Sequence, residues 1–192
     1  MSAKGRGSTS SANELYVTPD WCVDLIFKAR DPQGLKVLEP GCDKAPFLKK
    51  ARELGAARTV GFEERLVEGQ EWIDKLVIGD YTDTLGAVAA TGERFNMIIM
   101  NPPFSLTEKF IETSLRLLSA DGSIIVLQRL NWLSGADRTK KFHSKGHLRH
   151  THVLSNRPRF IKGKSGDACE YGYLVFNNEC DSMSTLNHLI RK

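Results

Sequence analysis

Segments of strand and helix character alternate along most of this chain, and that alternation restricts its fold more than any other feature. From about residue 18 to residue 128, short apolar runs are separated by stretches whose apolar residues recur with helical spacing. Alternation of this kind predicts a mainly parallel sheet with helices on both faces, that is, a doubly wound α/β fold. The run from Ile124 to Leu127 is apolar at every position, as a strand covered on both faces requires.

Helix and turn signals set the expected bounds of these elements. Thr18 before Pro19 and Asp20 predicts a helix start, and Ser105 with Glu108 forms a capping-box pattern at another. The expected helices cover residues 18–30, 46–54, 66–75, 84–90 and 105–118. The expected strands cover residues 35–38, 59–62, 76–79, 95–100 and 124–127.

The last third of the chain changes character. Residues 153–154 and 171–176 have strand character and are joined by a long basic loop, so a C-terminal antiparallel hairpin is expected to finish the sheet. We expect a flexible tail over residues 1–12, one domain over 13–180, and a tail or short helix over 181–192. The chain has no run of about 18 apolar residues and no paired cysteine spacing. A soluble, cytoplasmic protein with reduced cysteines and no membrane contact is therefore expected.

Polar residues follow four successive strands of the predicted sheet at the point where each strand ends. These residues are Glu39, Glu63, Asp80 and Asn101. Ligands of doubly wound sheets bind outside the carboxyl ends of the strands, so these side chains are expected to line one site. A site rich in acceptors, without the glycine-rich turn and Lys of a phosphate site, suits a cationic ligand with hydroxyl groups. S-adenosylmethionine has this chemistry, with an ammonium, a sulfonium and a ribose diol.

Together with the tetrapeptide Asn101-Pro102-Pro103-Phe104, this pattern resembles the class I, Rossmann-like S-adenosylmethionine-dependent amino-methyltransferases. The motif order is similar to that of the gamma group of DNA adenine-N6 methyltransferases, above all the small phage-type enzymes. The resemblance implies that Glu39 faces the methionine ammonium, Glu63 the ribose hydroxyls and Asp80 the adenine amino group. The cofactor-binding residues that it implies are Tyr16, Thr18, Pro19, Glu39, Pro40, Gly41, Phe47, Glu63, Asp80, Tyr81 and Asn101.

One turn departs from the family pattern. The family usually has glycines where this chain has Asp43 and Ala45, in the turn that approaches the methionine. Asp tolerates left-handed backbone better than most residues, which would preserve the turn, but its charge bears on cofactor affinity. The departure leaves open a different class of function, a catalytically silent homologue that binds nucleic acid.

The residues of the tetrapeptide, Asn101, Pro102, Pro103 and Phe104, are the expected catalytic group. An adenine amino nitrogen is a poor nucleophile because its lone pair is delocalised into the ring. The Asn101 side-chain carbonyl and the Pro102 backbone carbonyl would hold the two amino hydrogens and turn the lone pair toward the methyl donor. The two prolines restrict the backbone before them to extended conformations, and Phe104 is placed to stack on the base.

The segment from Gln128 to Lys164 is strongly basic. It holds ten Lys and Arg residues against one acid, whereas the net charge of the whole chain is +4. So local an imbalance favours a nucleic-acid partner, DNA first, over an ordinary solvated surface. Within the segment, residues 157–160 resemble the family's target-base motif. The substrate-binding residues expected beside Phe104 are Arg157, Arg159, Phe160, Lys162 and Lys164.

A base inside a duplex cannot reach such a loop, so the target is expected to be flipped out or single-stranded. An ordinary strand-edge aromatic residue is the alternative interpretation of Phe160. The histidines form no metal-ligand or catalytic pattern, so no metal is expected. The leading hypothesis is methylation of adenine in DNA, with RNA adenine, RNA guanine and protein glutamine as alternative acceptors. The target sequence and the oligomeric state stay open.

Overall fold

The computed structural model describes residues 17–66, 70–160, 168–178 and 185–190. Within these residues one 8-stranded sheet has the order β3-β2-β1-β4-β5-β7-β6-β8. Its strands are β1 (Lys36–Pro40), β2 (Arg58–Glu63), β3 (Lys75–Ile78), β4 (Phe95–Met100), β5 (Leu118–Arg129), β6 (Leu148–Leu154), β7 (Tyr171–Phe176) and β8 (Thr185–Leu189).

The first five strands run parallel, as the alternation predicts. β1 pairs with β2 and β4, β2 pairs with β3, and β4 pairs with β5. The chain first moves outward from β1 to β3 and then returns to the other side of β1 with β4. This reversal of strand order marks the place where doubly wound sheets bind ligands, outside the carboxyl ends of β1 and β4.

Strand β7 enters the sheet antiparallel, between β5 and β6. The predicted C-terminal antiparallel hairpin is therefore confirmed, although β6 begins at Leu148, earlier than the sequence pattern indicates. The expectation for residues 181–192 is wrong over Thr185–Leu189, which form β8 rather than a tail or a helix. Strand β8 pairs with β6 and supplies partners for backbone groups that the sheet edge would otherwise expose.

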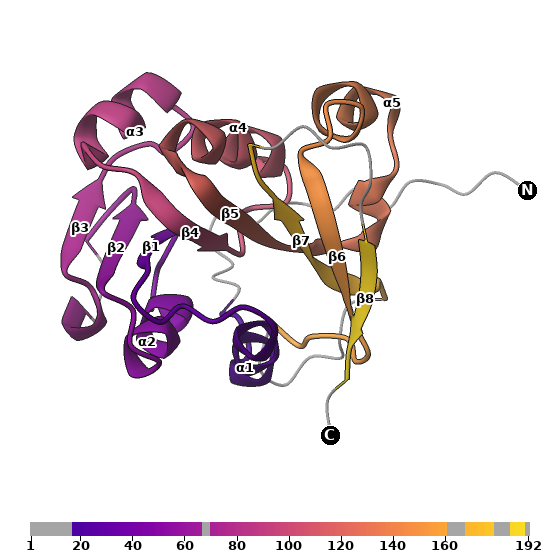
Figure 1. Cartoon of the computed structure of the whole chain (residues 1–192), viewed down its shortest axis with the longest axis horizontal. Coiled ribbons are helices and arrows are strands. Elements are labelled where there is room, and N and C mark those ends of the chain that lie inside the picture. Colours follow the sequence, from indigo (N-terminus) through magenta and orange to yellow (C-terminus); the bar gives the residue numbers. More distant parts are fainter. Residues whose placement is uncertain (1–16, 67–69, 161–167, 179–184, 191–192) are drawn as a thin grey trace, which may run out of the picture.

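Helices cover both faces of the sheet. α1 (Asp20–Ala29) and α2 (Pro46–Glu53) lie on one face, and α3 (Thr84–Thr91), α4 (Thr107–Leu117) and the short α5 (Ala136–Arg138) lie on the other (Figure 1). The short helical turns are η1 (Gln70–Trp72), η2 (Leu130–Leu133) and η3 (Thr139–His143). Because both faces are covered, the apolar residues form two cores, one under α1 and α2 and one under α3 and α4.

Several local predictions differ from the structure. Pro19 rather than Thr18 is the N-cap of α1, and α4 begins at Thr107 without a side-chain cap. Leu54 and Leu106, inside the ranges expected to be helical, lie just outside α2 and α4 and are 39% and 37% exposed. A helix was expected over residues 66–75. In the described part of that range the helical residues are those of η1, and Lys75 already begins β3. There the Asp74 carboxylate accepts the Thr59 backbone N–H at 2.8 Å, which ties the chain to β2 before β3 begins.

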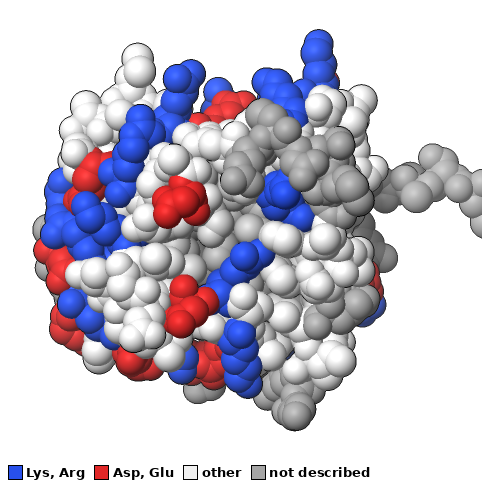
Figure 2. All heavy atoms as spheres, in the orientation of Figure 1, with Lys and Arg blue, Asp and Glu red and all other residues white. Residues whose placement is uncertain are grey.

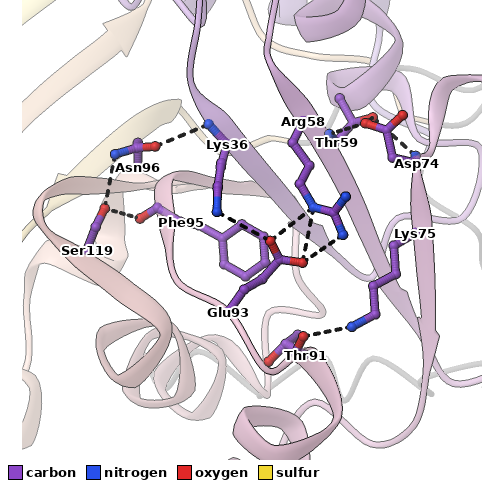
Figure 3. A network of polar contacts seen from close by, with 10 residues as sticks. All are labelled: Lys36, Arg58, Thr59, Asp74, Lys75, Thr91, Glu93, Phe95, Asn96 and Ser119. Carbon is purple, nitrogen blue, oxygen red and sulfur yellow. Dashed lines mark hydrogen bonds and ion pairs between the residues drawn. The ribbon is translucent and has the colours of Figure 1, made fainter.

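Ion pairs hold the amino ends of the parallel strands together, as Figure 3 shows. Glu93, just before β4, accepts two hydrogen bonds of 3.0 Å from the Arg58 guanidinium and pairs with Lys36 at 3.7 Å. Asp74, just before β3, pairs with Arg52 of α2. These two acids are neutralised by cations of the chain itself, and this end of the sheet is built for stability.

Candidate cofactor and substrate site

A buried carboxylate lies at the carboxyl end of β1. Glu39 is 3% exposed, and its Oε2 accepts the backbone N–H of Leu48, in the first turn of α2, at 2.9 Å. Burial raises the pKa of Glu39 well above its ordinary range, against the lowering effect of this hydrogen bond. The nearby Asp43 and Glu63 carboxylates raise the pKa further. A buried acid whose charged neighbours are acids is a place where a cationic ligand is favoured.

The turn between β1 and α2 has left-handed backbone at Gly41, Asp43 and Ala45, with φ angles of 66°, 38° and 49°. The backbone thus adopts the conformation that glycine favours although two of the three residues are not glycine. Each of those two residues carries strain of order 1 kcal/mol. The Asp43 N–H donates to Glu63 Oε2 at 3.1 Å, which fastens the turn to the end of β2.

The acids after β2 and β3 are held by hydrogen-bond donors without a full charge. Glu63 Oε1 accepts the Glu64 N–H at 3.0 Å. Asp80 Oδ1 accepts the hydroxyl of Thr82 at 2.6 Å and its N–H at 2.7 Å, and these bonds lower the pKa of Asp80. Among the residues that the structure describes, neither acid has a Lys or Arg ion-pair partner, and Glu39 has none either.

The catalytic loop predicted from the sequence follows β4 and meets the segment before α1. Asn101 Nδ2 donates to Thr18 Oγ1 at 3.2 Å, and Thr18 is 3% exposed. Because the amide nitrogen points to Thr18, the amide oxygen is the acceptor end of this side chain. The Pro103 carbonyl accepts the Leu106 N–H at 2.9 Å, so the loop closes directly into α4. Two motifs separated by 83 residues are therefore in direct contact.

Three aromatic rings from distant segments lie beside this loop. Phe104 and Phe160 both pack against Tyr171, with ring centroids 6.0 Å and 5.2 Å from it. The Arg129 guanidinium lies over the Phe104 ring at 4.6 Å, and its Nε donates to the Tyr171 hydroxyl at 3.1 Å. Phe104 and Phe160 thus share Tyr171 as a packing partner, and the role of Phe160 at the target base stays a prediction.

Sequence reasoning missed Arg129 and Tyr171. Arg129 ends β5, and Tyr171 begins the neighbouring β7. The acids were found by inspecting the residue at the end of each of the first four strands. The same inspection of the fifth strand would have found Arg129.

Two residues expected at the cofactor are buried in the core. Phe47 is 0% exposed and packs edge-on against Tyr173, with ring centroids 6.4 Å apart. Tyr81 is 3% exposed, and its hydroxyl lies 3.0 Å from that of Ser114 in α4. Both side chains lie in the apolar layers between sheet and helices, and their assignment to the cofactor stays a prediction.

The other expected cofactor and substrate residues are placed as follows. Pro40 ends β1, and the exposed Gly41 begins the left-handed turn. Pro19 lies between Thr18 and α1. Tyr16, Lys162 and Lys164 lie outside the described residues.

Several Lys and Arg side chains of the basic segment, residues 128–164, pair with acids of the same chain. Lys141 binds Glu108 of α4 at 2.8 Å, and Arg138 pairs with the same carboxylate at 3.4 Å. Arg157 forms an ion pair with Glu170, whereas Arg159 is exposed. On the face in Figure 2, Lys and Arg side chains form no single continuous patch, and acidic side chains lie among them. Part of the segment's charge is therefore used in contacts within the chain.

In the described ranges, no three His, Cys, Asp or Glu side chains gather as a possible metal site. No helix in those ranges is both long and apolar enough to cross a membrane.

Comparisons with known proteins bear on the fold. No protein-family model matches the chain. A type II methyltransferase of Thermus thermophilus, M.TthHB8I, is 26% identical over an alignment of 145 residues that covers 57% of this chain. The alignment covers 32% of that relative, so this chain spans about a third of its length.

Two solved structures are similar to the whole described sheet with its helices. The M protein of the type I restriction enzyme EcoKI superposes with a TM-score of 0.68 at 16% identity, over 94% of this chain and 49% of the M protein. A TehB-like S-adenosylmethionine-dependent methyltransferase from Corynebacterium glutamicum gives 0.56 at 17% identity, over 87% of this chain and 90% of that protein. The chain therefore has the Rossmann-like α/β fold of the class I S-adenosylmethionine-dependent methyltransferases.

Proposed function

We propose that this protein transfers a methyl group from S-adenosylmethionine to the exocyclic amino group of adenine in DNA. The observation that carries the proposal is the position of the Asn101 loop. It lies at the carboxyl end of β4, beside the strand whose carboxyl end holds Glu39, and it is held by Thr18 at Asn101 and by Leu106 at the Pro103 carbonyl. The similarity to a type II methyltransferase and to the fold of a type I M protein supports DNA as the carrier of the base.

The acids of the site fit the proposed cofactor. Glu39 is a buried carboxylate with acidic neighbours, which a methionine ammonium would stabilise. Glu63 and Asp80 have carboxylates without cationic partners in the described chain, and they suit ribose hydroxyls and an adenine amino group. The turn at Gly41 presents backbone without a bulky side chain where the methionine would lie. When bound, the cofactor supplies an electrophilic methyl group on a sulfonium.

The catalytic loop acts on the amino nitrogen. Asn101 Oδ1 and the Pro102 carbonyl accept its two hydrogens out of the plane of the ring, which localises the nitrogen lone pair. The loop needs no strong base, because the nitrogen becomes cationic and acidic as it takes the methyl group and the methyl–sulfur bond breaks, and the methylated nitrogen then passes its proton to water. Thr18 holds the amide of Asn101 in place, so the acceptor is positioned before the base arrives.

The aromatic rings beside the loop favour a flat acceptor over a protein side chain. Phe104 belongs to the loop, and both Phe104 and Phe160 pack against Tyr171, so a base leaving the stack would meet aromatic surface. Stacking on an aromatic side chain contributes about 1–3 kcal/mol for each base. A glutamine amide offers far less area for such contacts.

A labelled-methyl assay tests the proposal. The protein is incubated with labelled S-adenosylmethionine and, separately, duplex DNA, single-stranded DNA, RNA or protein, and the products are digested for nucleoside mass spectrometry. We expect N6-methyladenine in one of the DNA samples. Label confined to RNA or protein would move the acceptor to one of the alternatives, and label on cytosine would contradict the proposal.

The Asn101→Ala variant isolates the chemical step. We expect its kcat to fall by about 10²–10³-fold, the effect of losing a positioned hydrogen-bonding group in an active site, while cofactor affinity stays within a few fold. Thr18→Val should show a smaller loss, since it removes only the contact that orients the amide. Equal losses of methyl transfer and of cofactor binding in Asn101→Ala would mean that the residue is structural.

Asp43 and Ala45 support the second candidate, a silent nucleic-acid-binding homologue. Calorimetric titration with S-adenosylmethionine separates the two. No binding at about millimolar cofactor, a concentration that detects interactions of only about −4 kcal/mol, would favour the silent homologue. The left-handed turn backbone at both residues favours the enzyme, because the shape of the turn survives the substitutions.

A further inference from the structure

Gln128, the penultimate residue of β5, has a buried side-chain amide to which the proposed chemistry assigns no role. Its Oε1 accepts the Arg129 backbone N–H at 2.7 Å. Because a backbone N–H can only donate, the oxygen of this amide must face Arg129, and the nitrogen Nε2 must point the other way. The orientation of the Gln128 amide is therefore fixed by the backbone of its own strand.

The amide nitrogen of Gln128 meets the hydroxyl of Thr107, the first residue of α4. Gln128 Nε2 donates to Thr107 Oγ1 at 2.6 Å, and Thr107 is 1% exposed. A hydroxyl that accepts an amide N–H has its single hydrogen left to donate. Thr107 Oγ1 donates to the Phe104 carbonyl at 3.2 Å and to the Pro103 carbonyl at 3.4 Å. The hydrogen bonds thus run in one direction, from Gln128 through Thr107 to the backbone of the Asn101–Phe104 loop.

These bonds occupy two of three successive carbonyls in the loop. The Pro103 carbonyl also accepts the Leu106 N–H at 2.9 Å, so the carbonyls of residues 103 and 104 are both used within the chain. In the part of the chain that the structure describes, no hydrogen bond reaches the Pro102 carbonyl. Rotation of the loop backbone would break the contacts with Thr107. The contacts therefore hold the Pro102 carbonyl in one direction while leaving it without a partner in the described chain.

From this geometry we infer that Gln128 and Thr107 are positioning residues, which hold the loop so that the Pro102 carbonyl can accept a hydrogen of the target amino group. The inference rests on the proposed function, in which this carbonyl is one of two acceptors. Both residues act through the loop backbone. Because both side chains are buried, water does not compete for their hydrogen bonds, and the loop is held before the base arrives.

The test removes each end of this Gln128–Thr107 relay and then both ends together. Thr107→Val deletes the hydroxyl at nearly constant volume, Gln128→Leu deletes the amide, and Thr107→Ser keeps the hydroxyl. Thr91→Val is the matched control. Thr91 is a buried threonine of α3 whose hydroxyl donates to the carbonyls three and four residues before it, as that of Thr107 does. It lies at the amino ends of the strands, away from the loop (Figure 3).

The kcat, the KM for single-stranded oligodeoxyadenylate and the affinity for S-adenosylmethionine are measured for each variant. We expect Thr107→Val to lower kcat about tenfold through displacement of a positioned group, with KM and cofactor affinity changing by less than about twofold. Gln128→Leu should show a similar loss. The combined variant should lose no more than the larger single loss, because both substitutions remove the same contact to the loop. Thr107→Ser should keep most of the wild-type kcat.

Thr91→Val should lower stability without lowering kcat, because it removes a hydroxyl of the same kind far from the loop. Equal losses of kcat in Thr91→Val and Thr107→Val would overturn the inference. So would losses that multiply in the combined variant, or a loss of cofactor affinity as large as the loss of kcat.

Hydrogen–deuterium exchange of the ligand-free proteins tests the contact independently of activity. Thr107→Val and Gln128→Leu should both speed exchange at residues 104–106, whereas Thr91→Val leaves it unchanged. If the wild-type protein methylates nothing, the proposed function fails, and the exchange measurement still decides whether the two residues hold the loop. Unchanged exchange in both relay variants would overturn the inference whatever the protein methylates.

Discussion

Acids at the amino ends of the parallel strands bind cationic side chains, whereas acids at the carboxyl ends of the same strands bind uncharged donors. At the amino ends, Glu93 binds Arg58 with two hydrogen bonds of 3.0 Å (Figure 3). Asp74 pairs with Arg52. At the carboxyl ends, Glu39 and Glu63 accept hydrogen bonds from backbone N–H groups. In the described chain they have no cationic partner.

This difference separates acids that stabilise the fold from the acids that we propose bind the cofactor. An acid that already has its counter-ion within the chain gains little from a cationic ligand. An acid held only by uncharged donors can take its counter-ion from such a ligand, and when the acid is buried its charged form costs stability until the ligand arrives.

The largest effect is expected when one acid at each end of the strands is replaced by its amide. We expect Glu39→Gln to weaken S-adenosylmethionine binding by about 10- to 100-fold, because it removes the charge opposite the ammonium but keeps an acceptor for Leu48. Glu93→Gln should leave cofactor binding unchanged and lower the free energy of unfolding by about 1 kcal/mol. Calorimetric titration and urea unfolding measure the two effects. Similar effects of both variants on cofactor affinity would contradict the distinction between the acids at the two ends of the strands.

The acid that departs from the family pattern offers the next test. Asp43→Gly relieves the left-handed strain, so we expect the free energy of unfolding to rise by about 1 kcal/mol, whereas loss of the negative charge near Glu39 should lower cofactor affinity by a few fold. Asp43→Asn is the control, because it removes the charge and keeps a side chain, so it should lower the affinity to the same extent with a smaller gain in stability. No change of affinity in either variant would show that the charge of Asp43 does not act on the cofactor.

The pH dependence of stability provides a third test. The folded-state pKa of Glu39 is raised by burial, so its contribution to stability is present at low pH and is lost as pH rises through the folded pKa. Without cofactor, Glu39→Gln should therefore be more stable than the wild type at pH 8, by about 2–4 °C in Tm. The gap should shrink as the pH falls, because wild-type Glu39 then takes up its proton. A gap independent of pH would mean that Glu39 does not titrate in this range.

The smallest expected effect concerns the basic segment. There too, we compare a cation that is paired with an acid of the chain with one that is exposed. Arg159 is exposed, whereas Arg157 is paired with Glu170. We expect Arg159→Ala to weaken DNA binding about threefold and to lower the salt-dependence slope by about one. Arg157→Ala should do less, and Arg138→Ala, whose side chain pairs with Glu108, should do nothing. Equal slopes for Arg157→Ala and Arg159→Ala would show that the ion pair opens on DNA.

Much of the fold could be predicted from the sequence, because strand and helix periodicities follow from local burial. The parallel strands, the α3 and α4 regions and the antiparallel pair of β6 and β7 are in place. The caps at Thr18 and Ser105 could not be settled locally, since the Thr18 hydroxyl is used by Asn101 far along the chain. Strand β8 was missed because a short edge strand has little apolar pattern of its own.

The sequence by itself determined which chemistry stands at the ends of the strands. Strand alternation brings those ends to one edge of the sheet, so Glu39, Glu63, Asp80 and Asn101 could be assigned to one site. Only the tertiary structure decided which charges are paired and which rings meet. Glu108 pairs with Arg138, and Arg129 covers Phe104, through contacts between segments that are distant along the chain. The physical reason is that a local pattern fixes the direction of a side chain, whereas its partner depends on how whole elements pack.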